Sequence, residues 1–319
     1  MTTAIEWTDA TWNPTTGCDR ISPGCDHCYA LTMAKRLKAM GAAKYQTDGD
    51  PRTSGPGFGV AFHDDALDEP LRWHKPRRVF VNSMSDLAHA RVSDEQLARV
   101  FGVMGAAHQH QFQVLTKRPR RLAKLLSGSE FRWRVAECAA SRTDEGHADW
   151  AFDAISGDDR WPLPNVWIGT SIESDEFCWR ADHLRVTPAA VRFLSLEPLL
   201  GPLPDLNLEG IDWVIAGGES GPKARPMHPQ WVRDIRDQCV DAGIAFFFKQ
   251  WGGWAPTGLG IGVFRPPELL IGPALDDMGH RQIMRRAGKK AAGRELDGLV
   301  WDQMPALSTH STEVLTNVG

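Results

Sequence analysis

Residues 11–29 read TWNPTTGCDRISPGCDHCY, and the rest of the chain is organised around this stretch. It holds three of the six cysteines, Cys18, Cys25 and Cys28, at the spacing C-x6-C-x2-C. The glycines and prolines turn the chain tightly, so the three thiolates can converge and backbone amides stay free to face bound sulfur. The pattern predicts a metal site in a loop that follows a first strand over residues 5–12.

Other roles for the three cysteines fit the loop less well. A disulfide is disfavoured because the cysteine number in the loop is odd and the N-terminus does not resemble a signal peptide. Buried apolar cysteines are disfavoured by the polar neighbours Asp19, Arg20 and Asp26. Structural zinc needs a fourth ligand, and His27 lies between two cysteines where its ring does not easily join them. An iron–sulfur cluster with three thiolates leaves one iron open to a non-protein ligand. The spacing alone leaves zinc and iron–sulfur open.

The composition indicates a globular protein. The chain has 319 residues, of which 42% are hydrophobic, enough for one large α/β barrel or two ordinary domains. A formal net charge of −4 does not draw the whole molecule to nucleic acid or to an anionic membrane, so any nucleic-acid surface must be local. No apolar run approaches the roughly 20 residues that cross a bilayer. We expect a cytoplasmic protein with no membrane partner.

Short apolar runs of strand length alternate with helical patterns along the chain. The strand candidates are residues 78–82, 112–116, 166–169, 191–195, 213–216 and 244–248, and the helix candidates are 30–40, 94–109, 119–126, 177–186 and 229–242. Ser93 is a reasonable N-cap and Gly243 a reasonable helix stop. The alternation predicts an α/β fold with a parallel sheet of βαβ units, arranged as a partial or nearly closed (β/α) barrel.

The barrel is expected to occupy residues 1–255, with two additions. Residues 128–164 are too many for a simple connection and predict a helical insertion. Residues 256–319 are rich in Gly and Pro and predict a C-terminal extension packed on the barrel. The polar, Gly-rich residues 41–59 predict a long loop that acts as a lid.

Polar residues follow every one of these strand candidates. They are Asn82, Ser83, Ser85, Asp86, Thr116, Lys117, Arg118, Thr170, Ser171, Glu173, Ser195, Glu197, Gly217–Gly221, Lys249, Gln250 and Trp251. Any one of them is as easily a turn residue, but parallel barrels gather functional groups at the carboxyl ends of their strands. Gly217 and Gly218 would let the backbone approach a ligand, and Lys117 or Arg118 would pair with a carboxylate. Acceptors for ribose hydroxyls or an ammonium group are available from Glu173, Glu197 and Glu219.

This combination resembles the radical S-adenosylmethionine superfamily. The superfamily's usual spacing is C-x3-C-x2-C with an aromatic residue before the third cysteine, whereas here the first gap is six and His27 holds that place. Its Gly-Gly-Glu follows the second strand, but here it follows the sixth, and residues 82–86 (NSMSD) occupy the earlier place. The resemblance implies a [4Fe-4S] cluster on Cys18, Cys25 and Cys28. It also implies S-adenosylmethionine contacts from His27, Tyr29, Ser83, Ser85, Asp86, Lys117, Ser171, Glu173, Glu197, Gly217, Gly218 and Glu219.

More closely, several strings resemble a phage-associated, poorly characterised branch with widely spaced cysteines. They are residues 11–14 (TWNP), 82–86 (NSMSD), 115–119 (LTKRP), 217–221 (GGESG) and 247–252 (FFKQWG), and the resemblance spans about residues 5–305. It implies that one electron, from a donor such as flavodoxin or ferredoxin, cleaves S-adenosylmethionine to methionine and a 5′-deoxyadenosyl radical that abstracts hydrogen from a substrate.

The substrate is less constrained. Basic patches occur at residues 72–78, 117–121 and 285–290, and two of the three carry no more charge than a solvated face would. The second lies at the expected active rim, and the first holds Trp73 and His74 between cations, which is compatible with phosphate contacts and base stacking. We therefore expect modification or repair of a base, with DNA or RNA as partner. A peptide or small metabolite is the alternative substrate, and a non-catalytic, zinc-stabilised nucleic-acid-binding protein is the alternative class. A hydrolytic barrel using Glu197 and Glu219 leaves the cysteine loop unexplained. Cys138, Cys178 and Cys239 have no ligand spacing and are assigned to packing.

Overall fold

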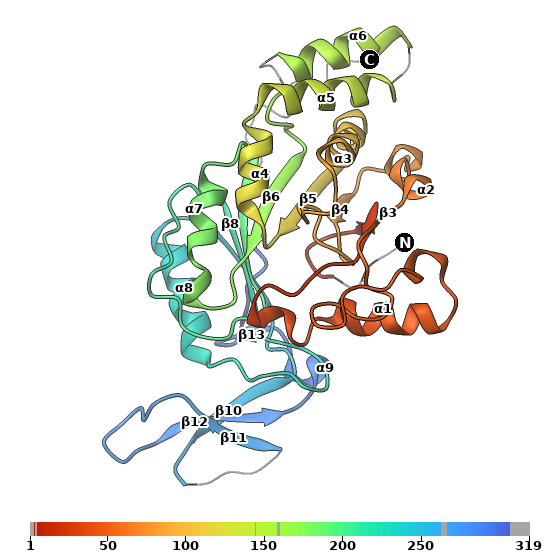
Figure 1. Cartoon of the computed structure of the whole chain (residues 1–319). Helices are drawn as coiled ribbons and strands as arrows, with labels where there is room; N and C mark the ends of the chain where they lie inside the picture. The colour runs from red at the N-terminus through yellow and green to blue at the C-terminus, as the bar shows by residue number, and fades with distance from the viewer. Residues whose placement is uncertain (1–2, 4, 144, 158–159, 263–266, 307–319) are drawn as a thin grey trace.

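A seven-stranded parallel sheet forms the body of the protein in the computed structural model, which describes all residues except 1–2, 4, 144, 158–159, 263–266 and 307–319 (Figure 1). The strand order is β1 (Ala10–Trp12), β4 (Arg78–Val81), β5 (Gln111–Thr116), β6 (Val166–Ser171), β7 (Val191–Leu196), β8 (Trp213–Gly217), β9 (Ala245–Gln250). The sheet is curled (Figure 1), and because β1 and β9 stand at opposite ends of this order and do not pair, it is an open half-barrel. The predicted (β/α) barrel is confirmed in its partial form.

Helices cover the outer face of the sheet, and they follow the predicted pattern (Figure 1). They are α3 (Asp94–Ala106), α4 (Pro119–Leu126), α7 (Trp179–Arg185) and α8 (Pro229–Asp241). The Ser93 side chain accepts from the backbone N–H of Gln96, and the Gln96 side chain accepts from the Ser93 N–H, which makes a capping box. Gly243 has a φ of +66° directly after α8, so the predicted helix stop is confirmed.

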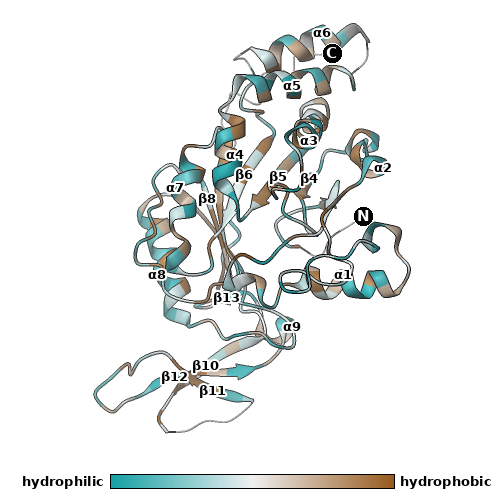
Figure 2. Cartoon of the chain, in the orientation of Figure 1, coloured by the Kyte–Doolittle hydropathy of each residue, from teal (hydrophilic) through white to brown (hydrophobic). Residues whose placement is uncertain are grey.

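Side chains on the two faces of the sheet have different neighbours. Residues that point outward, such as Val81, Val114 and Ile168, pack under the helices. Apolar strands enclosed by helices with mixed hydropathy are visible in Figure 2. Each of five strands carries one inward-pointing aromatic residue within its first three positions, and together with Trp7 these residues form what we call the aromatic plug: Trp7, Phe80, Trp167, Phe193, Trp213 and Phe247.

Trp213 lies at the centre of the aromatic plug. Its ring centroid is 5.7–6.1 Å from those of four neighbours, in tilted or edge-to-face arrangements that suit the ring quadrupoles. Its Nε1 donates to the carbonyl of Gln303 at 2.9 Å, which satisfies the buried indole. The plug fills the amino-terminal half of the barrel, so the open space lies at the carboxyl ends of the strands.

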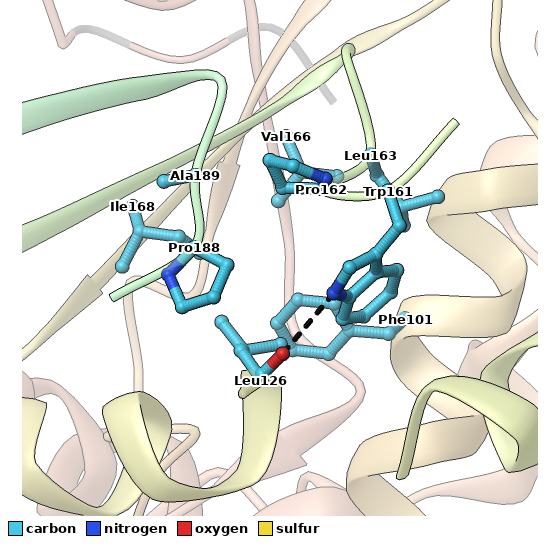
Figure 3. Close-up of a pocket in the computed structure, with 9 residues that line it drawn as sticks. All are labelled: Phe101, Leu126, Trp161, Pro162, Leu163, Val166, Ile168, Pro188 and Ala189. Carbon is cyan, nitrogen blue, oxygen red and sulfur yellow. Dashed lines mark hydrogen bonds between the residues drawn. The ribbon is translucent and has the colours of Figure 1, made fainter. Parts of the chain in front are cut away.

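The interval from 128 to 164 holds two helices, α5 (Ser129–Ala140) and α6 (Glu145–Ser156), which pack outside α3. The Trp161 Nε1 donates to the carbonyl of Leu126 at 3.1 Å and fixes the return of this insertion (Figure 3). The gap beside it measures about 10 Å³ and is lined by apolar residues such as Phe101 and Ile168. A space of this size holds at most about one water molecule, so it is a packing gap and not a ligand site.

The C-terminal part contains strands that the sequence did not indicate. An antiparallel sheet of β10 (Trp254–Gly260), β12 (Arg281–Arg286) and β11 (Glu268–Ile271) projects from the barrel (Figure 1). The chain then returns through α9 (Lys289–Ala292), β13 (Glu295–Leu296) and β14 (Leu299–Val300). Phe248 N–H donates to the carbonyl of Trp301 at 2.9 Å, and Gln303 N–H donates to that of Phe246 at 3.2 Å. These bonds cover the outer edge of β9.

The remaining elements of the described residues lie in the connections between β1 and β4 and between β6 and α7. They are β2 (Thr15–Thr16), η1 (Pro23–Cys25), α1 (Tyr29–Ala39), η2 (Ala43–Tyr45), β3 (Ala61–Phe62), α2 (Asp64–Leu67), η3 (Pro70–Arg72) and η4 (Asp175–Phe177). Asp19 ties the cysteine loop to residues 41–59 by accepting from Thr53 Oγ1 at 2.7 Å and Ser54 Oγ at 3.1 Å. Within the described part of the chain, every helix is too short or too polar to cross a bilayer.

Candidate functional site

A cavity of about 1000 Å³ opens at the carboxyl ends of the parallel strands, and all three loop cysteines line it. Of the other predicted site residues, those that line it are His27, Tyr29, Ser83, Ser85, Asp86, Lys117, Ser171, Glu197, Gly218 and Glu219. Glu173 and Gly217 are not among the lining residues. The topology therefore brings the cysteine loop and most of the polar strand ends to one space.

The three cysteines come from different local structures. Cys18 follows β2, Cys25 ends the short 3-10 helix η1, and Cys28 is the N-cap of α1. Burial raises the pKa of Cys18 to about 12, while Arg118, whose Nη1 lies 3.5 Å from the sulfur, opposes the rise. Burial also raises the pKa of Cys28, and the first amides of α1 oppose it. The charge of Cys25 acts on both thiols, so the three groups are neighbours. A metal would bind with loss of protons from Cys18 and Cys28.

The donor set fits a cluster better than a single ion. Among the described residues, no group of three or more His, Cys, Asp and Glu side chains is close enough to hold one metal ion. A tetrahedral zinc needs four ligands about 2.0–2.3 Å from one point. In a four-iron cluster each thiolate binds its own iron, so the sulfurs need only to surround a common space. Three soft thiol donors around one cavity, with no fourth protein ligand, meet that requirement.

Asp86 is occupied by scaffold contacts. Its carboxylate accepts from Thr116 Oγ1 at 2.6 Å, from the Lys117 backbone N–H at 3.0 Å and from Arg118 Nη1 at 3.0 Å. Because Arg118 also reaches Cys18, Asp86 links the end of β5 to the first cysteine. Most of the acceptor capacity of the Asp86 carboxylate serves this link.

Glu173 is likewise held by the protein. Its side chain is fully buried and pairs with Lys117 Nζ and with Arg180 Nη1, the latter at 3.0 Å, while Ser22 Oγ donates to it at 2.8 Å. Burial alone would raise its pKa, but Lys117 and Arg180 outweigh burial, and the pKa is lowered. A Cβ at Gly24 would lie 2.4 Å from Glu173 Cγ, so only glycine fits there. The predicted cation Lys117 therefore holds Glu173 against the cysteine loop.

The Gly-Gly-Glu segment holds the same loop from the other side. Arg225 donates to both carboxylate oxygens of Glu219 at 2.9 and 2.6 Å and to the carbonyl of Pro23 at 2.9 Å. His27 Nδ1 lies 3.1 Å from Glu219 Oε2. Arg225 and His27 lower the pKa of Glu219 against the effect of burial. A Cβ at Gly218 would lie 2.1 Å from the carbonyl oxygen of Trp251, so this glycine permits close packing against β9.

The predicted contacts on the opposite wall are also bonded to the protein. Tyr29 Oη donates to the carbonyl of Ser83 at 2.5 Å, and Asn82 Nδ2 donates to Ser85 Oγ at 2.5 Å. The carboxylate of Glu197 pairs with Lys249 and Gln250. Sequence reasoning noted Lys249 and Gln250 as strand ends but did not select them as site residues.

Arg180 and Arg225 were missed altogether. They lie in a short helix and in a loop, and no pattern in the sequence marks either position.

The basic patches do not form one surface. Lys117, Arg118 and Arg121 are all paired, the last with Asp94 at 2.5 Å. The patch at 72–78 precedes β4 and so lies at the amino end of the barrel, away from the cavity. Its Trp73 has Arg77 over one face at 5.1 Å and the ring of His110 at 5.6 Å. These patches supply few free phosphate contacts near the cavity.

Comparison with known proteins gives distant structural likeness. The chain is similar to the complex of spore photoproduct lyase with dinucleoside spore photoproduct, with 12% identity over 87% of this chain and 68% of that chain and a TM-score of 0.36. It is similar to a variant of that lyase in which one tyrosine is replaced by phenylalanine, with the same identity and coverage and a TM-score of 0.37. Likeness at this level says nothing about activity.

No curated protein matches the sequence. A family model described as "Protein of unknown function (DUF5131)" matches residues 2–305. Since the match covers nearly the whole chain, this protein belongs to the DUF5131 family.

Proposed function

We propose that the protein is a radical S-adenosylmethionine enzyme that acts on a nucleic-acid base or nucleotide. The observation that carries the proposal is that three cysteine thiols share one cavity of about 1000 Å³ with the polar carboxyl ends of a parallel half-barrel. In this proposal Cys18, Cys25 and Cys28 would bind a [4Fe-4S] cluster, which would leave one iron without a protein ligand. Flavodoxin or ferredoxin would deliver the electron.

The cluster and S-adenosylmethionine, when bound, would supply one-electron cleavage of the sulfonium to methionine and a 5′-deoxyadenosyl radical, which takes a hydrogen atom from the substrate. The protein's own residues orient the reactants and exclude water. Met33, Leu37, Tyr45, Phe58 and Met84 give the cavity an apolar wall on the side of α1 and residues 41–59. The opposite wall, at the strand ends, is polar.

The arrangement argues against the zinc alternative. His27 is the histidine within the cysteine loop, and among the described residues it does not join the cysteines in a group of three or more side chains close enough to hold one metal ion. A structural zinc site would have no need of a large cavity beside it. Three braces, centred on Asp86, Glu173 and Glu219, fix the cysteine loop to three different strand ends. Such fixing suits a site that must hold a reactant in register.

The nucleotide part of the proposal rests on the lining of the cavity. Arg20 is an exposed guanidinium at the lining with no ion-pair partner among the described residues, and it is suited to a phosphate. Most other cations near the site are already paired, which favours a single base or nucleotide over a long stretch of backbone. A labelled oligonucleotide whose affinity falls between low and high salt would support phosphate contact, and an affinity independent of salt would contradict it.

Reconstitution without oxygen tests the enzyme class. The wild-type protein should bind about four irons, turn brown and form 5′-deoxyadenosine with a chemical reductant. Cys25→Ala should lose both cluster and cleavage, whereas Cys178→Ala, which removes a half-buried thiol outside the cavity, should keep both. A colourless protein that retains zinc, or a Cys25→Ala variant that still cleaves S-adenosylmethionine, would refute the proposal.

A further inference from the structure

An irregularity in β9 turns two consecutive side chains toward the cavity. Ala216 of β8 pairs with Phe248 of β9, but Gly217 pairs with Gln250, so Lys249 and Gln250 together oppose one residue. This is a β-bulge, a feature that re-aims side chains and occurs often beside active sites. In a regular strand Lys249 and Gln250 would point to opposite faces. Here both line the cavity.

Glu197, at the end of β7, fixes the orientation of both side chains. Its Oε2 accepts from Lys249 Nζ at 2.8 Å, and its Oε1 accepts from Gln250 Nε2 at 3.2 Å. Because the amide nitrogen of Gln250 must face the carboxylate, its Oε1 faces away from Glu197. The pair of charges is largely buried, with 13% of the Lys249 side chain and 19% of the Glu197 side chain exposed.

These contacts leave hydrogen-bonding capacity unused. Gln250 is only 4% exposed, and its Oε1 has no hydrogen-bond partner among the described residues. A buried acceptor without a partner is costly, so the site is built for a group that donates to it. The ammonium of Lys249 carries three donors and gives one to Glu197, so two remain for an acceptor.

The surface beside these polar groups is apolar and aromatic. Trp7 and Phe80 of the aromatic plug and Leu115 of β5 line the same cavity. A flat ring could therefore pack on this floor while its edge meets Lys249 and Gln250. The combination calls for a planar heterocycle with a donor next to an acceptor.

We infer that Glu197, Lys249 and Gln250 form a subsite for the lactam edge of a nucleobase, the adjacent C=O and N–H of a uracil-like or hypoxanthine-like ring. The N–H donates to Gln250 Oε1, and the carbonyl oxygen accepts from Lys249. One spare N–H of Lys249 meets the carbonyl oxygen; adenine and cytosine present an amino donor beside a ring-nitrogen acceptor, so adenosine and cytidine are the comparison ligands in the test. This inference rests on the proposed function and names the part of the base that the cavity reads.

Nucleoside binding to the protein without cluster or S-adenosylmethionine tests the subsite directly. Ligand-observed NMR titrations with uridine and inosine should give saturable binding, and N3-methyluridine and 1-methylinosine should bind at least about tenfold more weakly because they lack the donor. Gln250→Met, which keeps length but removes the acceptor, should weaken uridine binding by a similar factor. Lys75→Met, at the exposed amino end of the barrel, should leave binding unchanged.

The outcomes separate this inference from the proposed function. Equal binding of methylated and unmethylated nucleosides by the wild type, or tighter binding of adenosine and cytidine, would overturn the lactam subsite, even where reconstituted protein cleaves S-adenosylmethionine. Loss of cleavage in reconstituted Gln250→Met with uridine binding unchanged would make these residues cofactor contacts and would also overturn it. Absence of cleavage in the wild type would refute the proposed function alone. The methylated probes need no variant, so the test holds even where Gln250→Met fails to fold.

Discussion

Replacing Glu173 by alanine should destabilise the protein more than almost any other change at the strand ends. The substitution leaves the guanidinium of Arg180, which is 1% exposed, without its carboxylate partner. Its other partners among the described residues are the carbonyl of Ser171 at 2.8 Å and the rings of Phe177 at 4.2 Å and Trp179 at 5.8 Å. Removing one partner of a buried ion pair costs about 3–5 kcal/mol. We expect a loss of that size in the free energy of unfolding.

Urea denaturation of the apo protein, followed by tryptophan fluorescence, measures the loss. The double variant Glu173→Leu/Arg180→Met removes both buried charges with similar volume and should recover much of the stability, because Lys117 is partly exposed and can reach solvent. If Glu173→Ala lowered the unfolding free energy by less than about 1 kcal/mol, the effect would be that of a solvent-exposed ion pair. It would refute the view that this network is a buried brace.

The same carboxylate predicts a pH dependence. The pKa of Glu173 is lowered in the folded state, since Lys117 and Arg180 outweigh burial. A carboxyl of this kind stabilises the fold above its unfolded pKa of about 4.3, and the contribution is lost as the pH falls through the lower folded pKa. The difference in unfolding free energy between wild type and Glu173→Gln should therefore be largest near neutral pH and shrink below about pH 4. A difference that stays constant or grows with acid would contradict the assignment.

Two further substitutions test the packing that shapes the cavity. Gly218→Ala places a Cβ 2.1 Å from the carbonyl oxygen of Trp251 and should lower the unfolding free energy by about 1–3 kcal/mol. In the control Gly201→Ala the new Cβ meets no atom within 4 Å, so the unfolding free energy should not change. Equal effects of the two substitutions would contradict the close approach at Gly218. Trp213→Ala empties the centre of the aromatic plug and should lower the unfolding free energy by about 3–5 kcal/mol. Trp133→Ala is the control, because the Trp133 side chain is 53% exposed and its loss should change stability little. Thermal unfolding of the two variants measures the difference.

The barrel could be predicted from the sequence because its strands and helices have different periods. The apolar runs around Val114 and Val214 are short and β-branched, and the helix after Ser93 begins with a capping box. These signals are local in the sequence, and the strands and helices of the barrel form where the signals predict them. The strands of the extension are short and mostly exposed or half-buried. The apolar run of β11 has only three residues, Leu269 to Ile271, and β12 carries three arginines, so neither gave a clear strand signal.

Pairing at the site could not be predicted in the same way. The sequence shows that Lys117, Glu173 and Glu219 follow strands, but it does not show which charge meets which. Lys117 turns to Glu173 because Arg180, seven residues further along, fixes that carboxylate in place. The bulge at Lys249 depends on the register between β8 and β9, which is a long-range property.

The polar residues at the strand ends thus divide into two groups. Some hold the cysteine loop in place, and others keep hydrogen-bonding atoms with no partner in the described part of the chain. Asp86, Glu173 and Glu219 use their oxygens on cations that also touch the cysteine loop or its neighbours. Gln250 and Asn82 each keep a buried side-chain oxygen without a partner among the described residues. Folding does not leave such atoms unmatched without cost, and these two residues also line the cavity, which supports the proposal that they receive a ligand there. The three-cysteine loop and this recognition wall share one cavity, which is the arrangement a reaction between a bound cofactor and a positioned base requires.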